Sequence, residues 1–336
     1  MWNSVANETT AAARRDHYRA AEQAMWQHHG AGAPVERWTD VGALGIRVRT
    51  LDVGAGRPVL FVHGGPNAGA TWGPLVGHLD GVRALAVDRP GCGLSDPLDY
   101  STISTRQMWD ALVTTLVAVL EDADTGPVDA VGSSFGGACV LWLARQRPDL
   151  VHSIVLEGVP LVEGMVLAPN LRPLAIRPLG RLIARLPARD ADVRRTFRQL
   201  GHECLVTGGW PSGPDRDWGL SMMNDTATMR NEVRLIQKGA SWRGFRPGVG
   251  FDSAALGGIT APTLWIVGDR DPFGSVALVE SWAHEMPAAA LTVMPDSGHL
   301  PWLDDPEEHA RLIEDFWSSR PNPSASASHP ASEGET

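Results

Sequence analysis

The sequence predicts an α/β protein in which helices cover both faces of a mainly parallel sheet. Six apolar runs are too short for helices and indicate strands buried on both faces; they span 58–63, 84–88, 128–132, 153–157, 263–268 and 290–294. Segments with helical character alternate with these runs, at 72–79, 105–121, 135–147, 275–285 and 306–317. Such alternation is typical of parallel strands joined by right-handed helical crossovers.

Two further strands precede this pattern. Residues 35–41 and 44–53 are rich in β-formers and flank a glycine-bearing turn, which predicts an antiparallel pair. Upstream, residues 8–29 contain neither glycine nor proline, and Gly30 follows them, so we expect 1–30 to form an accessory N-terminal helix. This helix docks either on the body of the chain or on a second subunit of a homodimer, and the sequence leaves both arrangements open.

The alternation stops after Pro160. Residues 161–250 show helical stretches at 190–205 and 217–238 among many prolines and glycines. An insertion after the sixth strand starts at the carboxyl edge of the sheet, where α/β proteins bind ligands, so we predict a helical cap over the site; a decoration away from the site is the alternative. The core then comprises 31–160 and 251–320, and the Ser-, Pro- and Ala-rich segment 321–336 is expected to be a disordered tail.

The composition narrows the class of protein. The 336-residue chain has a net charge of -10, which argues against a nucleic-acid-binding protein, because such proteins usually present a basic face. No apolar run approaches the length that spans a bilayer, and the N-terminus lacks a signal segment, so we expect no membrane association and a cytoplasmic location. The three cysteines form no C-x-x-C pair, which predicts neither a metal site nor redox chemistry; they are Cys92, Cys139 and Cys204.

One short motif carries a candidate nucleophile. Gly132-Ser133-Ser134-Phe135-Gly136 stands between a buried strand and a helix. In such an elbow the central serine takes a strained backbone angle that points its Oγ out of the turn, and its neighbours two residues away must be small. Centring the two glycines selects Ser134 over Ser133. A plain strand-to-helix turn with a serine cap is the structural alternative.

A second glycine-rich loop, His63-Gly64-Gly65-Pro66, directly follows the third predicted strand. Cleavage of an ester places negative charge on the carbonyl oxygen, which pairs of backbone N–H groups stabilise. We expect these two donors to be the N–H of Gly65 and the N–H of Phe135. His63 ends its strand and is expected to order the loop rather than act as a base.

The acid–base partners should follow the nucleophile, on loops at the carboxyl edge of the sheet. His299 lies just beyond the last predicted strand and is the candidate base. Of the other histidines, His202 in the predicted cap is a candidate substrate contact, and the rest fall in helices, strands or the tail. Asp271 follows the strand at 263–268 and is the candidate acid that orients His299. Glu157, at the end of another strand, is the alternative acid.

Taken together, these motifs resemble those of the α/β-hydrolase superfamily over about residues 35–317, including the string Asp-Arg-Pro-Gly-Cys-Gly-Leu-Ser-Asp at 88–96. The resemblance implies an eight-stranded, mostly parallel sheet and a two-step mechanism without metal or organic cofactor, in which Ser134 attacks, His299 moves the proton and Asp271 holds the imidazole. His-Gly-Gly-Pro is similar to the loop of proline iminopeptidases, although those enzymes typically carry tryptophan where this chain has Phe135. The string at 88–96 is similar to haloalkane dehalogenases and epoxide hydrolases, whose nucleophile is aspartate; meta-cleavage-product hydrolases and carboxylesterases are compatible as well.

The cap and the mouth of the site should select the substrate. The residues that we expect in this pocket are apolar or amide-bearing: Trp72, Trp210, Met222, Met223, Asn224 and Trp302. They favour an apolar small molecule bearing an ester, lactone or thioester. The alternatives are a cyclase or acyltransferase that uses the same triad, C–C bond hydrolysis, an aminopeptidase, and a non-catalytic receptor for a small ligand.

Overall fold

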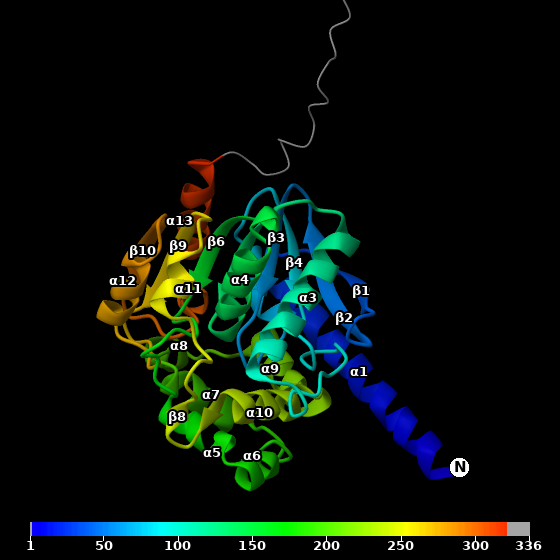
Figure 1. Cartoon of the computed structure of the whole chain (residues 1–336). Helices are drawn as coiled ribbons and strands as arrows, with labels where there is room; N and C mark the ends of the chain where they lie inside the picture. The colour runs from blue at the N-terminus through cyan, green and yellow to red at the C-terminus, as the bar shows by residue number, and fades with distance from the viewer. Residues whose placement is uncertain (1, 321–336) are drawn as a thin grey trace, which may run out of the picture.

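The computed structural model describes residues 2–320, with side chains described from residue 10 onward. Its centre is a sheet of eight strands in the order β1-β2-β4-β3-β5-β6-β9-β10, which confirms the predicted fold class (Figure 1). The strands are β1 (Val35–Val41), β2 (Ile46–Gly54), β3 (Arg57–Val62), β4 (Val82–Val87), β5 (Val128–Ser133), β6 (Val151–Glu157), β9 (Thr263–Gly268) and β10 (Ala289–Met294). Strand β2 is antiparallel to β1 and β4, and all the other neighbouring pairs are parallel.

Helices bury both faces of this sheet. The side chains of β3 alternate between two apolar clusters: Leu60 and Val62 join one, and Val59 and Phe61 join the other. The first cluster is completed by α3 (Thr105–Ala123), α4 (Phe135–Gln146), α11 (Ser253–Gly257) and α12 (Val276–His284). The second is completed by α1 (Trp2–His28), α2 (Gly73–Val76) and α13 (Pro306–Ser318). Burial on both sides explains why the central strands are continuous apolar runs.

The segment between β6 and α11 is largely helical. Its elements are α5 (Arg172–Ala175), α6 (Arg177–Ile183), α7 (Asp190–Gln199), α8 (Glu203–Thr207), α9 (Gly213–Asp225), α10 (Thr228–Gly239) and a small hairpin of β7 (Ala240–Ser241) and β8 (Gly244–Phe245). Figure 1 shows them gathered below the sheet. The two long helices predicted here are each broken in two. In the first, Gly201 has a φ of 92°, and a Cβ there would lie 2.3 Å from the Arg270 carbonyl oxygen, so the helix ends before it.

The C-terminal half of α1 docks on the body of its own chain, which is the first of the two arrangements that the sequence left open. Tyr18, Met25 and Trp26 are buried. The buried Arg49 of β2 links Glu22 of α1, at 2.7 Å, to Asp88, also at 2.7 Å. The start of α1 projects from the body (Figure 1).

No helix within residues 2–320 combines the length and the apolarity needed to cross a bilayer. The predicted disordered tail, 321–336, lies outside the described residues.

Candidate active site

The elbow between β5 and α4 holds Ser134 in a strained conformation. Its φ of 52° and ψ of -119° are unusual for a residue with a Cβ. A Cβ at Gly132 would lie 2.8 Å from the Gly136 carbonyl oxygen, and a Cβ at Gly136 would lie 2.1 Å from that of Val62. Both glycines are therefore required by the close approach of backbones. Ser134 lines a cavity, whereas Ser133 is fully buried.

The loop after β10 brings His299 to Asp271, which follows β9. The imidazole Nδ1 of His299 lies 2.7 Å from Asp271 Oδ2, and the two side chains are almost completely buried. Two backbone groups hold the carboxylate: the Val159 N–H donates to Oδ2 and the Phe273 N–H donates to Oδ1, each at 2.9 Å. An ionised carboxylate accepts all three hydrogen bonds, and Nδ1 donates, so Nε2 of His299 is the nitrogen left to accept a proton.

Glu157, the alternative acid, has another partner. Its fully buried carboxylate lies 3.1 Å from Nε2 of His309 on α13. Burial opposes the charged imidazole, but the attraction of Glu157 outweighs it and raises the pKa of His309. The structure thus pairs His299 with Asp271, and Glu157 with His309.

Hydrogen bonds to its backbone carbonyl groups fix the conformation of the loop after β3. His63 Nδ1 lies 2.6 Å from the Gly64 carbonyl oxygen, and its Nε2 accepts from the Arg89 N–H. Burial and the neighbouring Arg89 hold the pKa of His63 well below its ordinary value, so the ring is neutral. The Arg89 guanidinium donates to the carbonyl oxygens of His63 and Gly64. His63 therefore orders this loop. Gly65 lines the cavity beside Ser134 and Phe135, and these two residues stand at the N-terminus of α4, where negative charge is favoured.

Helix α10 contributes a residue to this loop that no sequence motif indicated. Glu232 of α10 is 3% exposed, and its Oε1 accepts from Arg89 Nη2 at 2.9 Å and from Cys92 Sγ at 3.1 Å. A Cβ built on Gly65 would lie only 1.9 Å from Glu232 Oε2, so this oxygen lies directly beside Gly65. The sequence did contain a signal for Glu232: it lies one turn before Leu235 on the apolar face of an amphipathic helix, where a carboxylate is unexpected.

Two lobes of one cavity meet at Ser134, sharing Gly65, Leu171 and Phe273 as well. The apolar lobe encloses about 660 Å³, its mouth included, and is lined further by Phe135, Glu232 and a set of apolar residues: Met108, Leu161, Met165, Leu167, Leu235, Ile236, Ala240, Phe245 and Val249. The mixed lobe spans about 1100 Å³ with its open mouth included, and it contains His299 together with polar groups, among them Asn67, Thr71, Asn170, Thr196 and Asp215.

The residues predicted for the pocket divide into two groups. Trp210, Met222 and Met223 line the mixed lobe. Trp72 and Trp302 line neither lobe: they are fully buried and stack on each other, with ring centroids 4.4 Å apart.

Asn224 also lines neither lobe. Its side-chain amide makes two hydrogen bonds to the backbone of Ala188, and so ties α9 to the segment before α7. For these three residues the pocket prediction is corrected, because the large aromatic rings serve the core and the amide serves a helix contact.

The segment between α7 and α8 also contacts the loop that carries His299. The His299 N–H donates to the Leu200 carbonyl oxygen at 2.8 Å. His202, fully buried, lies 2.8 Å from Asp304 through Nδ1, and its Nε2 accepts from the Leu300 N–H at 3.1 Å. His202 therefore acts on the backbone next to His299 and lines neither lobe.

The chain belongs to the alpha/beta hydrolase family, whose model matches residues 59–312. The 2-hydroxymuconate semialdehyde hydrolase of a Pseudomonas species is 35% identical over 287 residues, which cover 82% of this chain and 92% of that protein. A proline iminopeptidase of Heyndrickxia coagulans is 25% identical over 290 residues, covering 79% of this chain and 92% of that protein. The solved 2-hydroxy-6-oxo-6-phenylhexa-2,4-dienoate hydrolase of a Rhodococcus species shares the fold, with a TM-score of 0.68 at 18% identity, covering 85% of this chain and 99% of that one.

Proposed function

We propose that this protein is a serine hydrolase that cleaves an ester, lactone or thioester of an apolar small molecule through an acyl-enzyme. The observation that carries the proposal is the strained Ser134 in the same cavity as His299, whose ring Asp271 holds at 2.7 Å. In this mechanism His299 takes the Ser134 proton as the oxygen attacks the carbonyl, and the N–H groups of Gly65 and Phe135 receive the oxyanion. His299 then protonates the leaving group, and water hydrolyses the acyl-enzyme.

The two lobes suggest where each half of the substrate lies. His299 lines only the mixed lobe, and Phe135 lines only the apolar lobe. Because the proton donor must reach the leaving group, we place the leaving group in the mixed lobe. The acyl group then occupies the apolar lobe, which favours a hydrocarbon or aromatic acyl chain.

The charges of the lining favour a neutral acyl group over an anionic one. Among the described residues that line either lobe there is no lysine or arginine, and the acids Glu232 and Asp215 are present. A buried carboxylate without a cationic partner is costly. The name of the Rhodococcus relative specifies a dienoate, which carries such a carboxylate. The lining therefore favours ester hydrolysis over C–C hydrolysis of a dienoate in this chain.

A second candidate function is an aminopeptidase. Glu232 Oε1 is engaged by Arg89 and Cys92, while Oε2 faces the loop at Gly65 beside Ser134. An acyl group that bears an amine would donate a hydrogen bond to this oxygen. The ion pair with Arg89 already balances the charge of Glu232, so we rank this candidate below the ester hydrolase.

A substrate panel separates these functions. We expect p-nitrophenyl butanoate and octanoate to be hydrolysed, and prolyl and alanyl p-nitroanilides and a 6-oxo-2,4-dienoate to be turned over far more slowly. Ser134→Ala should lower kcat by at least about 10⁴-fold and abolish labelling by a fluorophosphonate probe. The matched control is Ser133→Ala, which removes the neighbouring buried hydroxyl and should stay within about tenfold of the wild type. Ester hydrolysis that survives Ser134→Ala would refute the mechanism, and faster turnover of the anilides would favour the aminopeptidase.

A further inference from the structure

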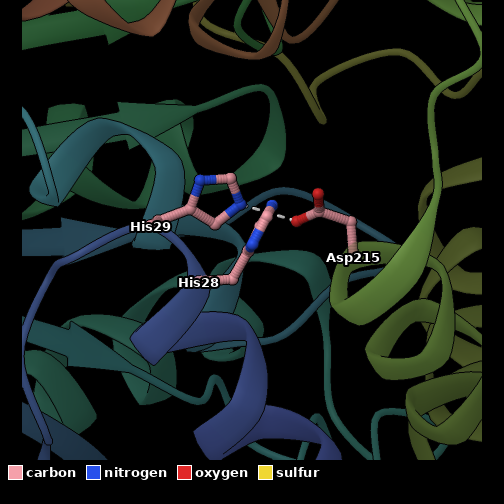
Figure 2. Close-up of side chains that lie close together, drawn as sticks. All are labelled: His28, His29 and Asp215. Carbon is pink, nitrogen blue, oxygen red and sulfur yellow. Dashed lines mark hydrogen bonds and ion pairs between the residues drawn. The ribbon is translucent and has the colours of Figure 1, made fainter.

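Three metal-ligating side chains meet where the N-terminal helix contacts the cap. His28 ends α1 and His29 follows it, while Asp215 lies in the first turn of α9. One ligand atom from each of the three lies within 4.8 Å of the other two. Figure 2 shows both imidazoles turned toward the carboxylate, with His29 Nε2 2.7 Å from Asp215 Oδ1. Residues far apart in the sequence thus converge on one point.

The spacing of these atoms suits a transition metal. Zn²⁺ binds imidazole nitrogen and carboxylate oxygen at about 2.0–2.1 Å, so tetrahedral geometry places ligand atoms roughly 3.3–3.4 Å apart. The separations here, from 2.7 Å to at most 4.8 Å, bracket that value. Small side-chain rotations would bring all three atoms onto one ion. We propose that His28, His29 and Asp215 form a binding site for a divalent transition-metal ion of the Zn²⁺ class, which clamps α1 to α9.

The place of His28 favours a metal site over a simple ion pair. The hydrogen bond between His29 and Asp215 is complete without His28, so it does not explain why a second imidazole lies beside it. Within residues 10–320 the His28 ring has no hydrogen-bond partner, and it packs edge-on against His29, with centroids 4.9 Å apart. A metal would bind both rings in their neutral form. The expectation of no metal rested on the spacing of the cysteines and on a reaction mechanism that needs no cofactor, and neither argument concerns a site formed by His28, His29 and Asp215.

Burial at the cluster is graded from the inside outward. The Asp215 side chain is 9% exposed, that of His29 is 19% exposed, and His28 is exposed. The carboxylate is thus held inside the contact, while the outer imidazole lies open to an ion arriving from solvent. With three protein ligands, water would complete the coordination.

The site adjoins the substrate cavity. Asp215 and Met25 both line the mixed lobe. Further along α9, at spacings that share its face, Trp218, Gly219 and Met222 line the same lobe. Helix α9 is therefore a wall of the cavity, and a metal bound at its first turn would hold that wall against α1. This inference does not depend on the reaction that Ser134 performs.

Direct titration tests the site. The full chain, without a histidine tag, is treated with a chelator, dialysed and titrated with Zn²⁺ alone by calorimetry, and Co²⁺ is used to record the visible absorption of the bound ion. We expect one ion per chain, with an affinity that falls at least about tenfold in His28→Ala and in Asp215→Asn. His28→Ala is the decisive variant, because it removes a ligand and leaves the His29–Asp215 hydrogen bond in place.

The matched control is His17→Ala. His17 also joins α1 to α9, through Asp225 at 2.7 Å, and lies outside the cluster. Its loss should leave the affinity for Zn²⁺ unchanged.

Amide hydrogen exchange tests whether the bound ion holds α1 against α9. Zn²⁺ should slow exchange at the end of α1 and the start of α9 in the wild type, and should have no such effect in His28→Ala. Equal affinity in His28→Ala and the wild type, no binding by the wild type, or exchange that Zn²⁺ does not alter would overturn the proposal.

Discussion

Replacing Asp271 by Asn tests the acid that orients His299. The carboxylate accepts three hydrogen bonds, from His299 Nδ1, from the Val159 N–H and from the Phe273 N–H. An amide offers only one oxygen. Whichever way it turns, its NH₂ group opposes either the Phe273 N–H, or the Val159 N–H together with His299.

Both orientations weaken the site. With the amide oxygen toward His299, the tautomer survives but the negative charge that stabilises the imidazolium is lost. With the NH₂ toward His299, the wrong tautomer is favoured as well. We expect kcat to fall by about 10⁴-fold, equivalent to about 5.4 kcal/mol at about 1.36 kcal/mol for each tenfold. The unpaired backbone N–H should lower the free energy of unfolding by about 1–3 kcal/mol.

The assay is the steady-state hydrolysis of a p-nitrophenyl ester, with folding checked by circular dichroism. The control is Glu157→Gln, which changes the other buried acid and leaves its backbone carbonyl bonded to the Ser134 N–H. This variant should lose stability through His309 while its kcat stays within about tenfold of the wild type. A folded Asp271→Asn enzyme with nearly normal turnover, beside a Glu157→Gln enzyme that has lost it, would refute the assignment.

Three other perturbations address selectivity, pH dependence and the docking of α1. Ile236→Trp, in the wall of the apolar lobe, should lower kcat/KM for an octanoate ester relative to an acetate ester by at least about tenfold, and an unchanged ratio would place the acyl group elsewhere. Because the pKa of His63 is lowered in the folded protein, the unfolded chain binds one more proton below about pH 6.5, and the free energy of unfolding decreases as the pH is lowered. Between about pH 6.5 and 5, the free energy of unfolding in urea should change more steeply with pH in the wild type than in His63→Gln, by up to about 1.4 kcal/mol for each pH unit. Equal slopes would contradict a neutral His63. Arg49→Met leaves Glu22 and Asp88 buried without their cation, and should cost about 3–5 kcal/mol in urea unfolding; a loss below about 1 kcal/mol would mean that the ion pairs of Arg49 contribute little to holding α1.

Local patterns in the sequence were sufficient to predict the architecture and much of the site. Apolar runs without helical periodicity marked strands buried on both faces, since a strand covered on both sides needs no polar alternation. The glycines around Ser134 marked the elbow, because a backbone approach that excludes a Cβ constrains residues next to each other in the chain. His299 and Asp271 were located because the carboxyl ends of parallel strands meet at one edge of a sheet.

The tertiary structure alone decided between residues that share a local pattern. Asp271 and Glu157 both follow parallel strands, and only the packing showed that one carboxylate faces His299 and the other His309. The direction of a tryptophan depends on its neighbours across the fold, so Trp72 stacks in the core while Trp210 lines the cavity.

The contacts of α9 and α10 with distant segments follow the same rule. Glu232 reaches Arg89 across 143 residues of sequence, and His29 reaches Asp215 across 186. The sequence by itself determined which segments become strands, helices and the elbow, because those depend on adjacent residues. The carboxylate that faces His299, the cavity wall and the cluster of His28, His29 and Asp215 were decided by the tertiary structure, because each depends on how distant segments pack together.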